Sequence, residues 1–297
     1  MSVASVEMRV FHAEVVRTED VSPALRRIVF GGPGLAGFRS TGVGDEYLRI
    51  LFPAAGETAP VLPEVVDGNL DYASIDLTRL RTYTVRDVDE ERGEVTIEFV
   101  VHEGGVAAAW AQQAKPGDVV GLNSPTGLYD PPSALDWQML VADCAALPAA
   151  ARILAETPDH VRTRVVVEVA DPAHRIPLPE RPGIDVTWVT GGNGHGPSRL
   201  AEVVRTLPRP EGVGYTWVAG EARALRDVRR HLRKDLGLPA SAYKTVGYWT
   251  ADADRWHEQF EALPADVRAE LDALWDSDRD PEDIEDEWDD RLTRLGL

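Results

Sequence analysis

The sequence contains a single cysteine, Cys144, in 297 residues. One cysteine cannot close an intramolecular disulfide, and it cannot supply the several thiolates that a zinc–thiolate or iron–sulfur centre requires. Lysine is also scarce, with only Lys115, Lys234 and Lys244, so arginine supplies almost all of the positive charge. These shortages exclude a disulfide-stapled fold and a metal centre built from cysteine.

Positive charge and long apolar runs are both in short supply. The chain has 31 Lys and Arg against 50 Asp and Glu, a net charge of −19, which argues against non-specific binding to nucleic acid or anionic membranes. No uninterrupted apolar run approaches the roughly 20 residues of a membrane span. Residues 1–10 lack the basic, apolar and small-residue order of a secretion signal. We therefore expect a cytoplasmic protein with no nucleic-acid partner and no membrane insertion.

Residues 7–131 are expected to form a domain of short β-strands. Apolar and polar residues alternate over 9–16, 25–30 and 94–101, and clusters of Gly, Pro and Asp separate these runs. Many short strands joined by turns are typical of a small antiparallel β-barrel. Residues 53–71 carry little periodicity and are expected to be a surface loop.

Residues 135–250 show a different pattern, in which apolar strands alternate with helices. Strands are expected at 137–142, 164–170, 185–190 and 215–219, and helices after 142, from 198 and over 221–236. This alternation predicts an open parallel sheet with helices on both faces, a fold that binds ligands beyond the carboxyl ends of its strands. The sequence therefore predicts a two-domain α/β protein, with the barrel first and the parallel sheet second.

Residues 251–297 are predicted to be an acidic helical extension. From residue 252 onward the chain has 17 acidic residues and 5 arginines, a net charge of −12. Ile284, Trp288, Leu292 and Leu295 are spaced as one apolar stripe of a helix. We expect this helix to cap the second domain, with a dimer contact or a lid over a ligand site as the alternatives.

The stretch 80–86, Leu-Arg-Thr-Tyr-Thr-Val-Arg, combines side chains that suit a flavin nucleotide. In a strand Tyr83 lies on one face, and Thr82 and Thr84 lie on the other. Arg81 can pair with a phosphate as a planar fork, Tyr83 can lie against an aromatic ring, and Thr84 can form a hydrogen bond near a ring nitrogen. Taken alone, the stretch would equally suit an ordinary half-buried strand.

Further motifs follow in a fixed order along the chain. They are Val-Val-His-Glu-Gly-Gly-Val-Ala-Ala-Ala-Trp at 100–110, Pro-Gly-Asp-Val-Val-Gly at 116–121, Ser-Pro-Thr-Gly at 124–127, Asp-Cys-Ala-Ala-Leu-Pro at 143–148, Trp-Val-Ala-Gly-Glu at 217–221 and Gly-Tyr-Trp at 247–249. With Arg-Thr-Tyr-Thr at 81–84, this set resembles the siderophore-interacting proteins, FAD-containing ferric-siderophore reductases related to the ferredoxin–NADP reductases. The resemblance covers roughly residues 9–250. It implies an FAD-binding barrel followed by an NAD(P)H-binding-like α/β domain.

The resemblance assigns FAD to two places in the first domain. Arg81, Tyr83 and Thr84 would hold and orient the flavin, and a helix start would hold the diphosphate through free backbone amides. The residues implied around this helix start are His102, Gly105, Val106, Ala107 and Ala108. The family has Pro and Ser where this chain has Val106 and Ala108, so one hydroxyl donor is missing and FAD should be held less tightly. A plain helix start beside a structural histidine is the alternative.

The residues that the resemblance implies for NAD(P)H are Asp143, Cys144, Ala145, Gly220 and Glu221. The family carries Glu and Thr where this chain has Cys144 and Ala145, which removes a charge and a hydroxyl. We expect Cys144 to be a buried thiol that acts as a small hydrophobe, with a redox nucleophile as the alternative. Gly220 would let a ligand approach the backbone, whereas a strand end followed by a helix cap is the alternative for this motif.

The residues that the resemblance implies for the substrate are Arg49, Lys244, Tyr248 and Trp249. Basic side chains at the mouth of the flavin site would suit bulky, often anionic ferric siderophores. After Trp249 the family continues with two basic residues and Gly, where this chain has Thr-Ala-Asp at 250–252. This departure implies a different iron chelate or a different acceptor. Arg49 and Lys244 could equally be solvated surface charges.

We therefore expect an FAD-dependent reductase of ferric siderophores or other iron chelates, with NADH or NADPH as electron donor and ferredoxin as the alternative donor. The flavin carries the chemistry, so this function requires neither a catalytic side chain nor a bound metal. Two other functions stay open: a flavin oxidoreductase with a non-iron acceptor, and a flavoprotein that binds a siderophore without turnover. We expect a monomer or a weak dimer.

Overall fold

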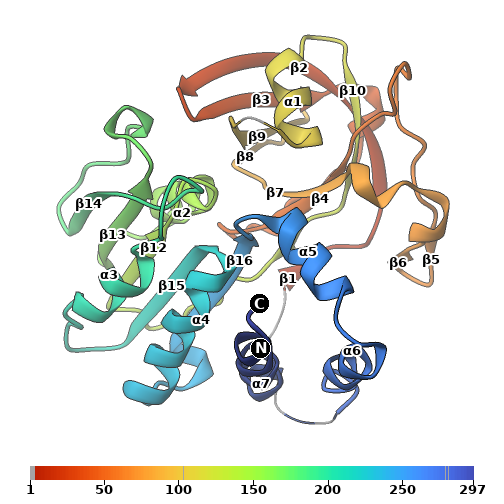
Figure 1. Cartoon of the computed structure of the whole chain (residues 1–297). Coiled ribbons are helices and arrows are strands. Elements are labelled where there is room, and N and C mark those ends of the chain that lie inside the picture. Colours follow the sequence, from red (N-terminus) through yellow and green to blue (C-terminus); the bar gives the residue numbers. More distant parts are fainter. Residues whose placement is uncertain (1–3, 103, 278, 280) are drawn as a thin grey trace.

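The computed structural model describes residues 4–102, 104–277, 279 and 281–297, which form two domains and a helical tail (Figure 1). The first domain contains β1 (Ala4–Ser5), β2 (Val10–Ser22), β3 (Leu25–Gly31), β4 (Tyr47–Leu51), β5 (Val65–Val66), β6 (Asn69–Leu70), β7 (Leu80–Thr84), β8 (Asp87–Asp89), β9 (Glu94–Val100), α1 (Val106–Gln113), β10 (Val119–Asn123) and β11 (Thr126–Gly127). The second contains β12 (Trp137–Ala142), α2 (Leu147–Glu156), β13 (Arg162–Val169), β14 (Ile184–Thr190), α3 (Leu200–Thr206), β15 (Gly214–Glu221), α4 (Ala222–Arg230) and β16 (Tyr243–Trp249). The tail contains α5 (Ala253–Glu261), α6 (Ala265–Asp272) and α7 (Pro281–Leu295). None of the helices in the described ranges has the length and hydropathy needed to cross a membrane.

The first domain is built on one curled antiparallel sheet. Its hydrogen-bonded order is β1-β11-β4-β10-β2-β3-β9-β8, with β7 paired to β4, and β5 and β6 form a separate small hairpin inside the predicted surface loop. The curl brings Tyr83 of β7 against Phe99 of β9, with ring centroids 4.4 Å apart. The predicted antiparallel barrel domain is confirmed, and among the described residues its ladder of strands forms a half-barrel.

Alternation along the strands builds the core of this domain. Val95, Ile97 and Phe99 of β9 are buried on the inner face, where they pack with Phe30 of β3. Trp110 of α1 stacks on Phe30 with ring centroids 6.2 Å apart. This contact fixes the helix whose first turn carries the predicted diphosphate-binding residues.

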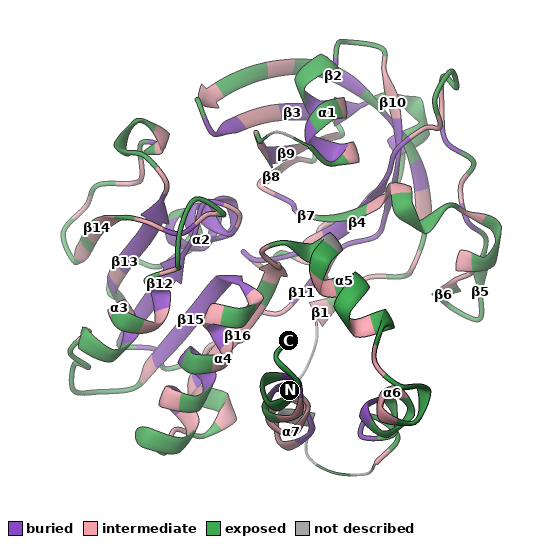
Figure 2. Cartoon of the chain, in the orientation of Figure 1, coloured by how far each residue is buried: buried purple, intermediate pink, exposed green. Residues whose placement is uncertain are grey.

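The second domain is an open parallel sheet with the order β14-β13-β12-β15-β16. All six residues of the central strand β12 are buried, because helices cover both faces (Figure 2). Leu140 packs in the cluster that contains α2, whereas the next residue, Val141, packs in the cluster that contains α3 and α4. The predicted doubly covered parallel sheet is therefore confirmed.

The two domains share buried apolar surface. Ala24 and Leu25, at the turn between β2 and β3, belong to the same buried cluster as Ile153 and Leu154 of α2. Leu25 and Leu154 are both fully buried. Since apolar burial contributes about 25 cal/mol per Å², this shared cluster favours one packed unit over two loosely tethered domains.

The tail has its own small apolar cluster, in which Trp256 packs against buried Leu271 and Leu292. The predicted stripe of α7 is buried at Ile284 and Leu292, whereas Leu295 is 43% exposed. Trp288 and Leu292 of the stripe pack in the tail cluster with residues of the other tail helices. A different face of α7 contacts the second domain.

Ion pairs hold α7 against α4. The Arg229 side chain is only 6% exposed, and its guanidinium meets Glu285 at 2.7 Å, Asp286 at 3.2 Å and Asp289. Further pairs join Arg226 to Asp289, Arg230 to Asp290, Arg233 to Asp283 and Asp286, and Lys234 to Asp286. The basic residues of α4 and of the turn that follows it therefore balance the negative charge of α7.

We expect Arg229→Met to release α7 from α4. Methionine keeps the apolar stem but leaves three acidic side chains without their shared cation, and breaking a buried pair costs about 3 kcal/mol or more. Amide hydrogen exchange within α7 should therefore accelerate by about a hundredfold. Arg230→Met removes a pair in which both side chains are more than half exposed, so it is the matched control and should have little effect. Equal protection of α7 in the two variants would contradict this account.

Candidate functional site

β7 is the strand around which the candidate flavin site is built. It pairs antiparallel with β4, so that Tyr83 lies opposite Leu48 and Thr84 opposite Tyr47. Tyr83 packs on the barrel core beside Phe99, and burial raises the pKa of its hydroxyl above the ordinary value. Thr84 lies on the opposite face, since successive side chains of a strand alternate. The alternation expected from the sequence is present.

Arg81 is exposed near the start of β7. Its Nη1 donates to the carbonyl oxygen of Thr78 at 2.9 Å and to that of Leu80 at 2.8 Å. Both acceptors are neutral carbonyl groups, so these contacts orient the guanidinium without neutralising its charge. An oriented guanidinium is suited to bidentate binding of a phosphate.

α1 begins at Val106, directly after Gly105, as the sequence predicts. Gly105 has φ 77°, a left-handed conformation that strains other residues, and a Cβ there would lie 3.4 Å from Cε1 of His102. The first amides of a helix have no acceptor within the helix, which makes them donors for an anion. Ala107 and Ala108 are buried, whereas Gly104 and Gly105 just ahead of the helix are exposed.

These groups fit an FAD nucleotide. Phe99 is in ring contact with both Tyr83 and Trp110, which places β7 and α1 beside one another. The site thereby combines a guanidinium, an aromatic ring, a hydroxyl group and helix-start amides.

The second domain contacts β7, which we call the flavin strand, through β16. Thr84 Oγ1 donates to the hydroxyl oxygen of Tyr248 at 3.4 Å. Burial raises the pKa of the Tyr248 hydroxyl above its ordinary value. Because β16 runs parallel to β15, Tyr248 lies at the carboxyl edge of the sheet, where this fold class binds ligands.

Asp143 follows β12 at the same edge and is 1% exposed. Its Oδ1 accepts hydrogen bonds from the amides of Ala145 at 2.9 Å and Ala146 at 3.2 Å, and its Oδ2 accepts from the indole N–H of Trp249 at 2.6 Å. Burial outweighs these hydrogen bonds and raises the pKa of Asp143 to about 6. The negative charge of Glu168, which is also buried, adds to the rise.

Cys144 is 3% exposed and packs in the apolar cluster of the second domain. Burial raises the pKa of its thiol to about 12, so the thiol is protonated at neutral pH. Its amide donates to Oδ1 of Asn193 at 2.9 Å, which ties the residue to the Gly191–Gly196 loop. A protonated and enclosed thiol behaves as a small apolar side chain.

Gly220 and Glu221 end β15 beside Asp143. A Cβ at Gly220 would come within 2.6 Å of the Asp143 carboxylate, so this close approach requires glycine. Glu221 caps α4, with Oε2 accepting from the Ala224 amide at 2.8 Å and Oε1 accepting from the Ala251 amide at 3.2 Å. Both oxygens of Glu221 bind the protein main chain, which is the helix-cap alternative for this residue.

The predicted substrate residues come from both domains. Arg49 of β4 is exposed, with its guanidinium carbon 5.2 Å from the ring centroid of Tyr72. Lys244 lies in β16, and Trp249 ends that strand. The Trp249 ring reaches from Asp143 to the Gly191–Gly196 loop, where Cη2 would be 3.9 Å from a Cβ at Gly194. Trp249 therefore lies across the carboxyl edge of the sheet, whereas Arg49 is held on the first domain.

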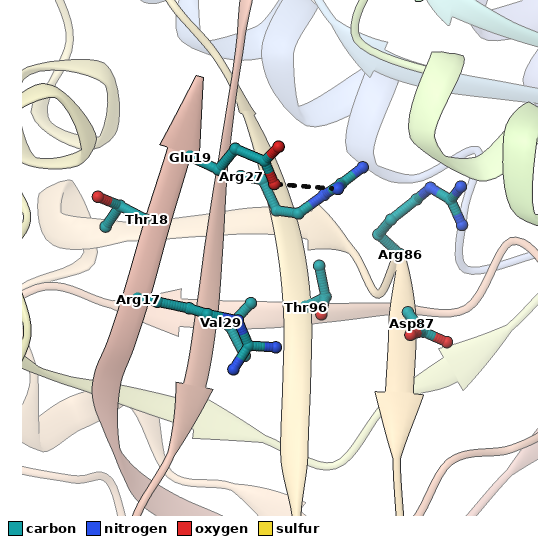
Figure 3. Close-up of a pocket in the computed structure, with 8 residues that line it drawn as sticks. All are labelled: Arg17, Thr18, Glu19, Arg27, Val29, Arg86, Asp87 and Thr96. Atoms are coloured by element: carbon teal, nitrogen blue, oxygen red, sulfur yellow. Dashed lines mark hydrogen bonds and ion pairs between the residues drawn. The ribbon is translucent and has the colours of Figure 1, made fainter. Parts of the chain in front are cut away.

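A separate cavity of about 320 Å³ opens on the outer face of the first sheet (Figure 3). Its lining consists of Arg17, Thr18, Glu19, Arg27, Val29, Arg86, Asp87 and Thr96. Arg17 pairs with Glu94 at 2.7 Å, and Arg27 pairs with the buried Glu98 at 2.6 Å. Carboxylates of the same sheet thus engage these arginines, and the lining includes none of the predicted site residues.

Sequence reasoning missed the polar residues that join the domains beside the site. Arg152 of α2 donates through Nη1 to Glu46 Oε1 and to the Val85 carbonyl oxygen, each at 2.8 Å. Trp217 of β15 donates through Nε1 to Oδ2 of Asp45 at 3.0 Å. The only local sequence signal for these contacts is the adjacent pair Asp45 and Glu46 before β4. Such acidic pairs are too common on protein surfaces to predict a domain contact.

The half-barrel and the parallel sheet, with β7 beside the carboxyl edge, have the fold of the ferredoxin-reductase-like flavoproteins. The fold is similar to that of phthalate dioxygenase reductase, with a TM-score of 0.53 at 15% identity over 80% of this chain and 68% of that chain. Two family models match the sequence, the siderophore-interacting FAD-binding domain at residues 14–129 and the siderophore-interacting protein at residues 135–252. The chain belongs to the siderophore-interacting protein family.

Relatives match both domains. A siderophore utilization protein from T. fusca is 34% identical, with a TM-score of 0.76 over 84% of this chain and 96% of that chain. The NADPH-dependent ferric-chelate reductase of Escherichia coli strain K12 is 29% identical over 249 residues, which are 82% of this chain and 94% of that protein. The family models end at residue 252, before α5, so they do not account for the tail.

The raised pKa of Asp143 predicts how stability depends on pH. Between its unfolded pKa of 3.8 and its folded pKa of about 6, the folded protein holds a proton that the unfolded chain has lost. The free energy of unfolding should therefore decrease as pH rises through this window, by about 3 kcal/mol for this group.

Urea denaturation of the parent and of Asp143→Asn from pH 4.5 to 7.5 measures the effect. The difference between the two proteins cancels the titrating groups that do not interact with Asp143. The parent should lose stability relative to the variant as pH rises. A difference that does not change across the window would show that Asp143 has an ordinary pKa.

Proposed function

We propose that this protein is an FAD-dependent reductase of ferric siderophores or related ferric chelates, with NADPH or NADH as electron donor. The observation that carries the proposal is the junction where Thr84 of the flavin strand meets Tyr248 at the carboxyl edge of the parallel sheet. Membership of the siderophore-interacting family supports the substrate class. The name of the Escherichia coli relative supports both NADPH and the ferric chelate.

The residues of the first domain would bind and orient the cofactor. Arg81 and the first amides of α1 would hold its phosphates, and Thr84 would form a hydrogen bond at the ring edge. Bound FAD supplies the redox chemistry, which is hydride acceptance from a nicotinamide and single-electron delivery to Fe(III). Iron would then leave the chelate, because hard oxygen ligands bind Fe(II) less firmly than Fe(III).

The residues of the second domain would shape the nicotinamide side. Gly220 leaves the main chain accessible next to Asp143, and Asp143 fixes the indole of Trp249 through one hydrogen bond. The Trp249 ring would limit the access of water to this edge. Cys144 and Ala145 would contribute shape rather than charge, since the first is protonated and the second is apolar.

The charge of the residues predicted to bind the electron acceptor favours one alternative function. Arg49 provides a positive charge beside the flavin strand, but Thr250, Ala251 and Asp252 after Trp249 provide none. This composition favours, as the second candidate, a flavin oxidoreductase whose acceptor is not an anionic ferric chelate. In a flavoprotein that binds a siderophore without turnover, neither NADPH nor NADH would reduce the flavin.

Absorption spectroscopy separates these functions. The purified protein is loaded with FAD and mixed with NADPH or NADH without oxygen, and a panel of ferric chelates is added afterwards with an Fe(II)-specific dye. Bleaching of the flavin band, followed by its recovery and by Fe(II) formation, is the expected result. Bleaching without recovery by any chelate would favour the second candidate. A band that neither nicotinamide bleaches would contradict the proposed electron donor.

We expect Arg81→Ala to weaken FAD binding by about 10- to 100-fold, because it removes a charge-assisted hydrogen bond to a phosphate. Quenching of FAD fluorescence on titration into apoprotein measures the dissociation constant. Arg81→Lys keeps the charge but not the planar fork, so its affinity should fall between those of the parent and Arg81→Ala. Parent-like affinity in Arg81→Ala would remove Arg81 from the FAD site.

A further inference from the structure

The segment from Val43 to Glu46 is wedged between the two domains. A Cβ on Gly44 would lie 2.9 Å from the Cα of Ile153 in α2, and one on Gly127 would lie 2.5 Å from the Cβ of Val43. Real Cβ atoms do not approach other atoms this closely, so both contacts depend on glycine. The main chain of the first domain therefore packs directly on the main chain of α2.

Glu46 binds α2 from within this segment. Its side chain is fully buried, and the side chain of its partner Arg152 is 7% exposed. Oε1 of Glu46 accepts from Arg152 and from the Ser40 hydroxyl at 2.6 Å, and Oε2 accepts from the amide and the hydroxyl of Thr41, each at 2.6 Å. The carboxylate is therefore held from both domains at once.

Asp45 binds β15, a second element of the second domain. Its Oδ1 accepts from the amides of Leu128 and Tyr129, where the chain leaves the first domain, and its Oδ2 accepts from the indole of Trp217. Burial raises the pKa of Asp45, and the hydrogen bonds oppose this rise. Asp45 thus joins the first domain to β15, as Glu46 joins it to α2.

The same residues hold the flavin strand. The Val85 amide donates to the Glu46 carbonyl oxygen at 2.9 Å, and Arg152 donates to the Val85 carbonyl oxygen at 2.8 Å. Val85 directly follows Thr84. On the other side, α2 starts just after Asp143, and Trp217 lies in β15, the strand that ends with Gly220 and Glu221. The contacts therefore connect the predicted flavin residues to both predicted nicotinamide segments.

We infer that Asp45 and Glu46 are positioning residues for electron transfer between the two domains. They fix the orientation of β7 relative to the carboxyl edge of the parallel sheet without contacting either ligand. This inference rests on the proposed function. Orientation affects the rate of transfer far more than it affects the binding of either partner alone, and a misplacement of about 1 Å can cost a hundredfold.

Glu46→Gln and Asp45→Asn are the informative variants, because each keeps the size of the side chain and removes its charge. Asp185→Asn is the matched control, since it neutralises an exposed ion pair with Arg164 in the second domain. Gly44→Ala is a second route to the same effect. It leaves every polar group in place and separates the segment from α2 by steric contact alone.

The first measurement is a distance, and it needs no enzyme activity. Spin labels on Glu91→Cys in the first domain and Glu180→Cys in the second report the interdomain distance by double electron–electron resonance. Both positions are exposed, and buried Cys144 should stay unlabelled. The parent and Asp185→Asn should give one narrow distribution, which Glu46→Gln, Asp45→Asn and Gly44→Ala should broaden or shift. Distributions that match the parent in all three variants would overturn the inference.

The second measurement is the rate of flavin bleaching by NADPH in a stopped-flow instrument without oxygen. The limiting rate should fall by at least about tenfold in Glu46→Gln, while the FAD dissociation constant and the NADPH concentration for half-maximal rate stay within about twofold of the parent. A rate loss that only follows lost FAD would make Glu46 a stability residue and overturn the inference. If no nicotinamide bleaches the parent, the proposed electron donor fails, and the limiting rate is measured with reduced ferredoxin, to which the same criterion applies.

Discussion

The arrangement of the two domains depends on one buried ion pair, Glu46 with Arg152. Removing both charges from water costs several kcal/mol, and their attraction offsets that cost only when the remaining donors and acceptors are also satisfied. Here Ser40, Thr41 and the Val85 carbonyl group satisfy them. Apolar residues of similar volume would hold two domains together at least as well. An ion pair with directional hydrogen bonds favours one relative orientation of the two domains. An apolar contact permits several orientations.

The carboxyl edge of the parallel sheet carries a related cost. Asp143 and Glu168 are each 1% exposed, and burial raises the pKa of both, so each destabilises the fold once it is ionised. Their hydrogen bonds shape the loops around the edge. Asp143 orders the start of α2 and orients Trp249, while Glu168 accepts from Ser198 and from the Arg199 amide. Carboxylates with perturbed pKa values cluster at functional sites. The carboxyl edge is therefore preorganised at the expense of stability. The ion pair of Glu46 with Arg152 sets the orientation of this edge relative to the first domain.

The sequence predicted what depends on local pattern and missed what depends on distant contact. Alternation in β9, the parallel strands and the helix start at Gly105 all follow from neighbouring residues, and the structure has them. For Glu221 the motif leaves a ligand contact and a helix cap open, and both of its oxygens accept from main-chain amides. Glu46 and Arg152 are 106 positions apart, so no periodicity connects them. The apolar stripe of α7 predicts that this helix packs on the second domain. Its contacts with α4 are ion pairs instead, and they depend on arginines of α4, a helix far from α7 in the sequence.

The near-absence of lysine has a structural counterpart at these places. Arg152 reaches Glu46, Glu156, the Val85 carbonyl group and Ser40, and Arg229 reaches three acidic side chains of α7. A guanidinium can do this because it presents five donors in a fixed plane and is weakly hydrated, so it can be buried among several acceptors at a tolerable cost. An ammonium group has three donors around one atom and a stronger hydration shell. Lysine in place of Arg152 would leave buried acceptors unpaired, and each such group would cost about 1–3 kcal/mol. Arginine at these two positions therefore meets the need for multiply bonded buried cations where the domains and the tail are joined.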